Sequence, residues 1–306
     1  MSMMSAPVDA PVWPQYGRAV HVGTSANGKV SVYFDPQLGR PGLQNACDLL
    51  TDADRVVAAN DRIFGIVSGA VNVIVFALGG RTDGTGGADH MACDFVNGGS
   101  IEVCAAFGAP ARVSALFEAE LSECSMGGRL CEVSTGEALS RWCAAVVSDN
   151  ALGDFATAPI WQAAGAPDFV NITDPTDRNP ISTGCGMAFL SWLLSLGHSL
   201  NEAARAMVTL GDTGTLAQLY AELTGNPATA AWDTFCTAVH ALPTKITTDD
   251  PFTALPMPAQ LALHNPGTAE PVDAALRPAP DPVCQIRSHR LLAADLDYPD
   301  DLTTQL

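Results

Sequence analysis

Basic residues are scarce in this sequence. Its 306 residues include 15 Lys and Arg against 33 Asp and Glu, the formal net charge is −18, and the only lysines are Lys29 and Lys245. Proteins that bind the phosphate backbone of nucleic acids need clustered basic side chains, and no such cluster occurs along the chain. We therefore expect no nucleic-acid partner, whereas the acidic surface would attract cations.

Long apolar runs are absent as well. A membrane-spanning helix needs about 18 or more consecutive, mostly apolar residues, and the sequence contains no such run. The N-terminal segment, MSMMSAPVDAPVWPQYG, lacks the basic region and apolar stretch of a secretory signal. These absences predict a protein that does not enter a membrane and that resides in the cytoplasm, with export as the alternative if a leader has been removed.

Short Cys-x-x-Cys pairs are missing too, because the nine cysteines are scattered along the chain. In the absence of a secretory signal, scattered cysteines favour buried, reduced thiols over a disulfide framework. If the protein is exported, the pair that we expect to form a disulfide is Cys124 and Cys131.

The composition that remains is that of a folded protein, with 47% hydrophobic and 16% charged residues. The length allows one large domain or two modest ones. Residues 18–34 contain two β-prone runs around an Asn-Gly pair and predict a β-hairpin. The pattern then predicts a helix at residues 43–65, a strand at 71–78, a Gly-rich loop at 79–90, a strand at 100–107, and helices at 110–126 and 134–148. Ser134 or Thr135 is the expected cap of the last helix.

The second half of the chain has a helical pattern. Residues 181–197 predict a strongly apolar helix, and shorter amphipathic helices follow it. We expect an α+β fold with a small mixed or antiparallel sheet. Its predicted parts are an N-terminal arm of residues 1–17, a domain of residues 18–242 with an α/β part (18–126) and a helical part (127–242), and a proline-rich tail of residues 243–306 that wraps the domain.

The segment LFEAELSECSM in the predicted helix 110–126 carries the first sign of chemistry. Residues three and four positions apart share a helix face, so Glu120, Glu123 and Cys124 point the same way. Two neighbouring carboxylates repel each other unless a cation or a proton lies between them. The next helix carries Glu137 in TGEALSRW, where it could lie over this face. The alternative interpretation is an acidic stripe that faces solvent.

The order of these elements, together with the two helical motifs, resembles the zincin metallopeptidases of the gluzincin type. Their active-site helix carries HExxH, and a second helix supplies a glutamate ligand. Here the sequence AELSE, residues 119–123, occupies the HExxH position, and GEALS, residues 136–140, resembles the motif of the third ligand. The resemblance implies that Glu120 is the general base and that Glu137 binds a metal. Both helix histidines are missing, because Ala119 cannot bind a metal and Glu123 replaces the second histidine.

A histidine that could replace them is His90, in the segment TGGADHMACDF. In a zincin-like layout the following strand borders the cleft. With two or three of Glu120, Glu123 and Glu137, His90 would form a site that suits Zn²⁺ best, with Mn²⁺ or Ca²⁺ as alternatives. Possible supporting or alternative ligands follow in the same segment: Asp89, Cys93 and Asp94. Otherwise His90 would be a loop residue that hydrogen-bonds to the backbone.

Two other segments are weaker candidates. Cys185 lies near the predicted start of an apolar helix, where the helix dipole would lower the pKa of a nucleophilic thiol. The alternative is a packed, apolar Cys185 in a helix capped by Ser182 or Thr183. Asp174 and Asp177 could hold Ca²⁺, but this segment lacks the alternating oxygen ligands of an EF-hand loop, and turn formation explains its composition more simply.

The sequence thus favours a metal-dependent hydrolase that acts on a small-molecule or peptide substrate. His90, Glu123 and Glu137 are the expected ligands, and Glu120 is the general base or a fourth ligand. The scissile bond, whether peptide, ester, amide or phosphoester, and the oligomeric state stay open. Two other hypotheses remain: a thiol hydrolase that uses Cys185, and a catalytically inactive, zincin-like binding protein.

Overall fold

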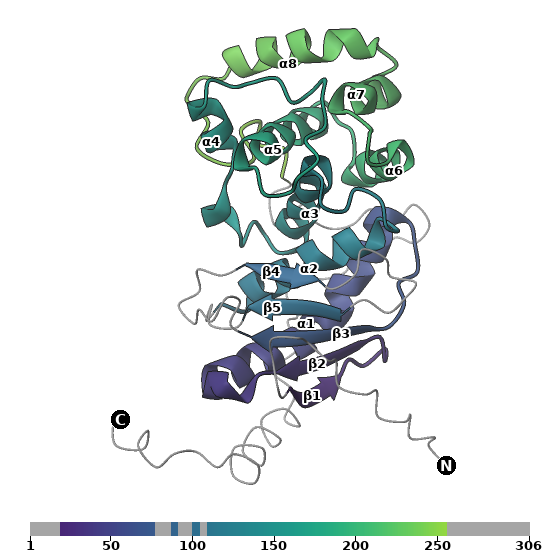
Figure 1. Ribbon diagram of the computed structural model, residues 1–306, viewed down its shortest axis with the longest axis vertical. Helices are drawn as coiled ribbons and strands as arrows, with labels where there is room; N and C mark the ends of the chain where they lie inside the picture. The colour runs from purple at the N-terminus through teal and green to yellow at the C-terminus, as the bar shows by residue number, and fades with distance from the viewer. Residues whose placement is uncertain (1–18, 77–86, 91–99, 105–108, 256–306) are drawn as a thin grey trace, which may run out of the picture.

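The computed structural model describes residues 19–76, 87–90, 100–104 and 109–255. Within them the chain has a mixed α+β fold, in which a small sheet with two helices is followed by a helical part (Figure 1). The strands are β1 (Val20–Thr24), β2 (Val30–Phe34), β3 (Val71–Phe76), β4 (Ala88–His90) and β5 (Ser100–Cys104). The α-helices are α1 (Gly39–Phe64), α2 (Pro110–Ser125), α3 (Ser134–Val147), α4 (Ala158–Ala163), α5 (Pro180–Ser195), α6 (Leu200–Leu210), α7 (Leu216–Thr224) and α8 (Ala231–His240).

The sheet is mixed, which is one of the two forms that the sequence predicted. Its strand order is β1-β2-β3-β5-β4, in which the three central strands are parallel and both edge strands are antiparallel to their neighbours. Residues 88–90 belong to the predicted Gly-rich loop, but they form the edge strand β4, where His90 pairs with Ile101 of β5. This edge is the one nearest to the helical part (Figure 1), so the backbone of His90 is held where the two parts meet.

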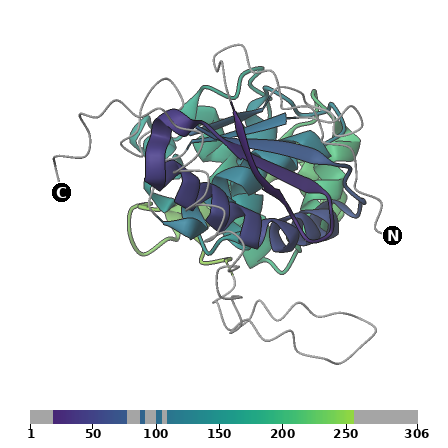
Figure 2. The same ribbon diagram turned by 90° about the horizontal axis from the view of Figure 1, so that it is seen from below.

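The hairpin predicted for residues 18–34 is confirmed as β1 and β2, which pair antiparallel. Gly28 in its turn has a φ of 78°, a left-handed conformation that glycine adopts without steric cost. The helix α1 starts four residues before its predicted start at Leu43 and ends at Gly65, which also has a positive φ. Seen from below, the sheet and α1 lie in front of the helices of the C-terminal half (Figure 2).

The helix α2 is buried on nearly all sides. Pro110 lies in its first turn, where the missing backbone N–H costs nothing. Leu116 and Leu121 belong to the main hydrophobic core, and α2 contacts α1, α3, β4 and β5. Glu118 and Glu123 on this helix are buried as well. The interpretation of its acidic residues as a solvent-facing stripe is therefore wrong.

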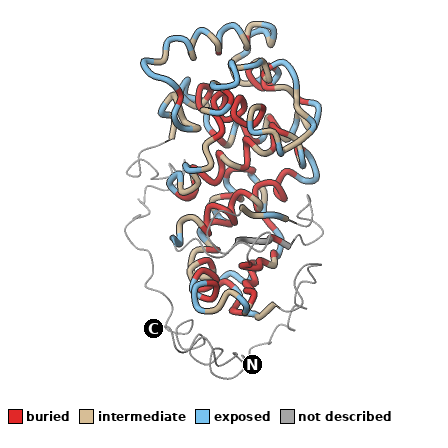
Figure 3. The backbone as a smooth tube through the Cα atoms, turned by 60° about the vertical axis from the view of Figure 1, so that its left-hand side comes forward, coloured by how far each residue is buried: buried red, intermediate tan, exposed pale blue. Residues whose placement is uncertain are grey.

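The apolar helix predicted for residues 181–197 is the centre of the helical part. In α5 every residue from Ser182 to Leu193 is buried, and the helix contacts α3, α4, α7 and α8. Two glycines allow this close packing, because a Cβ on Gly186 would lie 2.7 Å from the Cβ of Ala138 and one on Gly184 would overlap the carbonyl oxygen of Thr157. Burial is densest in these inner helices, whereas much of α8 is exposed (Figure 3). No helix among the described residues is long and apolar enough to cross a membrane.

Helix caps agree with the sequence only in part. Ser199 caps α6 with a capping box, and Thr215 does the same for α7. The expected cap of α3 is wrong, because Val133 precedes that helix without a side-chain cap and Ser134 and Thr135 lie inside it. For α5 the cap is Asn179, whose side chain accepts a hydrogen bond from Ile181 N, and not Ser182 or Thr183.

The first residues after α8 return to the helical part. Asp249 Oδ1 accepts hydrogen bonds from the backbone N–H groups of Thr157, at 2.7 Å, and of Ala158, at 2.6 Å, at the start of α4. Asp250 accepts a hydrogen bond of 2.6 Å from Ser191 Oγ on α5. Residues 243–255 thus pack against the domain as expected of the tail, whereas its remaining residues, 256–306, lie outside the described residues.

The cysteines correct the sequence prediction. Cys124 has a reduced thiol and forms no disulfide, so its expected pairing with Cys131 is wrong. Cys131 and Cys47 are each disulfide-bonded, which means that reduced thiols are not general in this chain. The other reduced cysteines among the described residues are Cys143, Cys185 and Cys236.

Substituting Gly184→Ala tests the packing of α5. Helix propensity alone would make alanine more stable than glycine by about 1 kcal/mol, but the added methyl group must displace the Thr157 carbonyl. We expect the free energy of unfolding in urea to fall by about 1–3 kcal/mol. Gly87→Ala is the control, since a Cβ there meets no atom within 4 Å. A more stable Gly184→Ala variant would contradict this packing.

Candidate metal centre and adjoining cavity

Three of the predicted site residues meet between the sheet edge and α2. His90 Nε2 from β4 lies 2.8 Å from Glu123 Oε2 of α2. One ligand atom from each of His90, Glu120 and Glu123 can be chosen so that all three lie within 4.8 Å of one another. This is the only group of three or more potential metal-ligating side chains found among the described residues. The prediction that His90 reaches the acidic face of this helix is confirmed. The alternative interpretation of His90, as a loop residue that only hydrogen-bonds to the backbone, is not confirmed.

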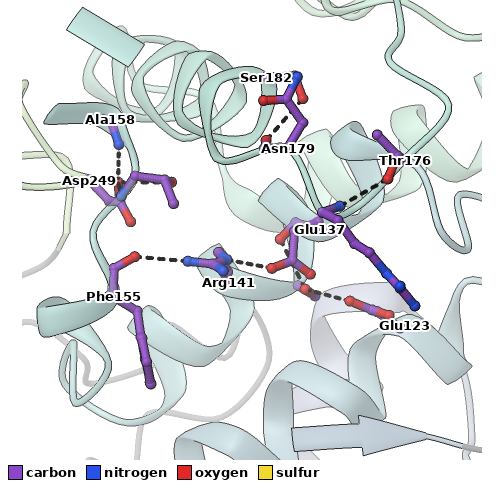
Figure 4. Close-up of polar contacts among 12 residues, drawn as sticks. Glu123, Glu137, Arg141, Phe155, Ala158, Thr176, Asn179, Ser182 and Asp249 are labelled. Atoms are coloured by element: carbon purple, nitrogen blue, oxygen red, sulfur yellow. Dashed lines mark hydrogen bonds and ion pairs between the residues drawn. The ribbon is translucent and has the colours of Figure 1, made fainter. Parts of the chain in front are cut away.

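Glu123 is also held from the helix α3. Ser140 Oγ lies 3.0 Å from Glu123 Oε1 and 3.0 Å from the carbonyl oxygen of Glu137. The two carboxylate oxygens of Glu123 thus face different partners, His90 on one side and Ser140 on the other (Figure 4 draws the contact of Glu123 with α3). Hydrogen bonds of this kind orient a carboxylate before any ligand arrives.

Glu137 lies next to this group but has a different partner. Arg141, one turn later on α3, donates a hydrogen bond from Nε to Glu137 Oε1 at 2.6 Å. The same guanidinium donates to the carbonyl oxygen of Phe155 at 2.9 Å, so that it bridges the two residues (Figure 4). The structure therefore groups Glu120, rather than Glu137, with His90 and Glu123.

A cavity of about 80 Å³ adjoins the three-residue group. Glu120, Glu137, Arg141 and Asp249 provide charged side chains to its wall. The remaining lining residues are smaller, apolar or neutral: Ala119, Ser140, Ala145, Asn150, Leu152, Phe155 and Met187. Because Glu120 belongs both to the wall and to the group with His90, it connects the candidate metal centre to a space that a ligand could occupy.

The charges of the group are strongly coupled. Burial alone would lower the pKa of His90, but hydrogen bonds to Cys124 and Glu123 and the charge of Glu120 outweigh it and raise that pKa to about 11. Burial raises the pKa of Glu120 well above its ordinary value, and the negative charge of Glu123 adds to the effect. In the metal-free protein, the imidazolium of His90 thus neutralises carboxylates that would otherwise repel each other.

Burial also raises the pKa of Glu137, to about 7, although the charge of Arg141 opposes this shift. A carboxyl group with such a pKa can exchange a proton near neutral pH, which is the property that general acid–base catalysis needs. The side chain of Glu137 lines the same cavity as Glu120. Its position is therefore suited to proton transfer with a ligand in the cavity.

Cys185 does not have the properties of a nucleophile. Its side chain is fully buried, and burial raises its pKa to about 12, whereas an activated thiol has a lowered pKa and is accessible. Asn179, and not a residue near Cys185, caps the helix. The structure thus favours the alternative that Cys185 packs as a small apolar residue.

The aspartates proposed for Ca²⁺ take part in local contacts. Asp174 Oδ2 accepts a hydrogen bond of 2.7 Å from the side chain of Asn179, and Asp177 lies 3.8 Å from the exposed Arg178. Asp174 and Asp177 are not part of the metal-ligating group found among the described residues. These contacts support turn formation as the reason for the composition of this segment.

Three residues of the site were not expected from the sequence: Ser140, Arg141 and Asp249. Arg141 follows Glu137 by four positions, a spacing that permits an ion pair on a helix and that could have indicated the contact. Asp249 has no such local signal, because its position in the cavity wall depends on how the chain returns to α4 after α8.

The titration of His90 tests the electrostatics of the metal-free site. NMR of the imidazole should show a ring that stays protonated through neutral pH and loses its proton near pH 11. Glu123→Gln should lower this pKa, because the variant loses the carboxylate that stabilises the imidazolium. Since folding raises the pKa above 6.5, the contribution of the pair to stability should be complete below about pH 6.5 and be lost as the pH rises towards 11. A ring that titrates near pH 6.5 in the parent protein would contradict the contact.

Comparisons with models of known protein families, with curated proteins and with solved structures find no match to this chain. The resemblance to zincins therefore stays a prediction, based on the order of the elements and on the positions of Glu120 and Glu137. What the structure establishes is narrower. A mixed α+β fold brings one imidazole and two carboxylates together at the edge of a cavity.

Proposed function

We propose that this protein is a metal-dependent hydrolase. The observation that carries the proposal is the group of His90, Glu120 and Glu123, which lies beside a cavity large enough for part of a small substrate. One imidazole nitrogen and two carboxylate oxygens are a ligand set that suits Zn²⁺, with Mn²⁺ and Ca²⁺ as alternatives. Three protein ligands leave a coordination position open, which is typical of catalytic rather than structural zinc sites.

Each protein residue has a defined part in this proposal. His90, Glu120 and Glu123 hold the ion, and Ser140 keeps the Glu123 carboxylate in place. When bound, a divalent ion supplies the Lewis acidity that lowers the pKa of water and polarises a substrate carbonyl or phosphoryl group. Glu137, on the cavity wall, accepts the proton of the attacking water. Arg141 holds the Glu137 side chain in position through its hydrogen bond to Oε1.

These roles differ in one respect from those that the zincin resemblance implies. By that resemblance Glu120 is the base and Glu137 is a ligand, whereas the distances favour the reverse, since Glu120 lies within the group and Glu137 is paired with Arg141. The resemblance still supports the proposal at a coarser level. Strand β5 leads to a buried helix with a glutamate at the HExxH position, and a second helix brings another glutamate to the same cavity.

A second candidate is a zincin-like protein without catalytic activity. It is favoured by Ala119, which lies on the cavity wall at the position of the first histidine of HExxH, and by the ion pair that already occupies Glu137. In this case the cavity would bind a ligand without cleaving it. The metal-binding and activity measurements described below separate the two functions.

The disulfide-bonded cysteines provide an argument about the cellular compartment in which the protein functions. Disulfides persist mainly in oxidising environments such as the cell exterior, and Cys47 and Cys131 are both disulfide-bonded. Export, the alternative to the cytoplasmic expectation, is therefore part of the proposal.

Metal titration of the metal-depleted, full-length protein tests the ligand set. Isothermal titration calorimetry with Zn²⁺ should give one bound ion per chain, and His90→Gln and Glu123→Gln should each weaken binding by about 10-fold or more, since each removes a ligand. His240→Gln is the matched control, because His240 is exposed and is not part of the group. A parent protein that binds neither Zn²⁺ nor Mn²⁺ would refute the proposal.

Two further substitutions assign the glutamates. Glu137→Gln should keep the metal but lose at least about 100-fold in turnover, the usual scale of general-base catalysis, whereas Glu120→Gln should lose metal affinity. Turnover would be measured on a chromogenic ester, a chromogenic phosphoester and a quenched peptide library. If Glu120→Gln bound the metal normally and only lost activity, Glu120 would be the base that the zincin resemblance implies. A parent protein that binds metal but hydrolyses none of these substrates would favour the binding protein.

A further inference from the structure

We propose that the cavity beside Glu120 binds a small primary ammonium group, and that it does so without a metal. The cavity measures about 80 Å³, which is the scale of a short amine and not of a large cofactor. Its wall combines carboxylates from α2, α3 and the segment after α8 with an apolar side. The inference concerns a binding site that lies next to the proposed metal centre, and it does not depend on hydrolytic activity.

The charges on the cavity wall favour a cation. The described lining contains the carboxylates of Glu120, Glu137 and Asp249, and Arg141 is its only cationic side chain. Arg141 donates its Nε hydrogen to Glu137, so these two opposite charges balance each other. Glu120 also faces the imidazolium of His90, and Asp249 also faces Arg141. Two cations, His90 and Arg141, thus stand against the four carboxylates of Glu120, Glu123, Glu137 and Asp249, so the surroundings of the cavity keep an excess of negative charge.

The carboxylates of Glu120 and Asp249 both have acceptor atoms to offer. The side chain of Glu120 accepts no hydrogen bond from the described part of the chain and borders the cavity. Asp249 uses Oδ1 for the backbone N–H groups of Thr157 and Ala158, at 2.7 and 2.6 Å, while its Oδ2 accepts no hydrogen bond from described residues. An ammonium group carries three N–H donors and no acceptor, which complements a wall that offers acceptors.

The other side of the cavity suits a short hydrocarbon chain. Leu152, Phe155 and Met187 contribute apolar surface to the lining. A ligand with a charged head and an apolar stem would place its head at the carboxylates and its stem against these side chains. An anionic ligand of the same size would meet the carboxylates instead, and Arg141 is already engaged by Glu137 and by the carbonyl oxygen of Phe155.

The small size of the cavity distinguishes binding at this site from the general attraction of cations to an acidic protein. The net charge of −18 draws any cation towards the surface, but such attraction does not depend on the size of the cation. A cavity of about 80 Å³ admits n-propylammonium and excludes tetrapropylammonium, which carries the same charge on a much larger body. Size dependence at constant charge is therefore the property to measure.

The first experiment titrates three probes into the metal-depleted, full-length protein at constant ionic strength, with chemical-shift changes in NMR as the signal. We expect saturable, one-to-one binding of n-propylammonium and no saturable binding of tetrapropylammonium or propionate. Equal binding of the two ammonium ions would show surface attraction alone and would overturn the proposal. Binding of none of the probes would overturn it as well.

Two variants locate the site. Asp249→Asn keeps an oxygen acceptor for Thr157 and Ala158 but removes the charge, and we expect it to weaken n-propylammonium binding by about tenfold or more, the scale of one charge-assisted hydrogen bond. Asp250→Asn is the matched control, because the neighbouring Asp250 contacts Ser191 and does not line the cavity; its affinity should equal that of the parent.

A third variant keeps the proposal testable if Asp249→Asn does not fold. Ala145→Leu adds bulk to the cavity wall from α3 without changing any charge, and it should also abolish binding of n-propylammonium. Unchanged affinity in folded Asp249→Asn or Ala145→Leu protein would place the amine elsewhere and overturn the inference. Because the titrations are done without metal, a protein that binds the amine but no Zn²⁺ would contradict only the proposed hydrolase, and the reverse result would contradict only this inference.

Discussion

The contact between His90 and Glu123 determines how Glu120 and Glu123 of α2 can be buried side by side. Carboxylates that lie close together in a protein interior repel each other unless a cation accompanies them. This chain contains few basic residues, and none of its lysines or arginines forms an ion pair with Glu120 or Glu123 among the described residues. The edge strand β4 supplies the missing positive charge through His90. A metal ion can replace the imidazolium proton as the source of positive charge beside these carboxylates, since metal binding and protonation compete for the same imidazole nitrogen.

The surrounding structure supports this contact from several directions. Pairing of β4 with β5 holds the backbone of His90, and Ser140 on α3 holds the second oxygen of Glu123. The close approach of α3 and α5 at Gly186 and Ala138 sets the position of α3. Arg141 pairs with Glu137 and holds that glutamate on the cavity wall beside the three-residue group. The site is thus built by elements that are far apart in sequence, and rigid packing positions its side chains better than a mobile loop could.

Local patterns in the sequence were sufficient for much of the fold and for part of the site. The Asn-Gly turn, the Pro110 helix start and the apolar helix of residues 181–197 each predicted the element that forms. Helical spacing placed Glu120 and Glu123 on one face, and the distances confirm it. Other features depend on tertiary contacts. A Gly-rich segment became the edge strand β4 because β5 offers it a pairing partner, and Asp249 reaches the cavity only because the chain folds back onto α4. The expected pairing of Cys124 failed for the same reason, since nearness in sequence does not determine which thiols meet.

The central claim is that His90, Glu120 and Glu123 hold a metal ion. The most direct measurement is a crystal structure of the full-length protein grown with Zn²⁺, with anomalous diffraction data collected on both sides of the zinc absorption edge. We predict an anomalous difference peak within bonding distance of His90 Nε2 and of one carboxylate oxygen each from Glu120 and Glu123, at about 2.0–2.2 Å. An intact hydrogen bond between His90 and Glu123 with no peak at this position, at a zinc concentration that saturates other sites, would contradict the account.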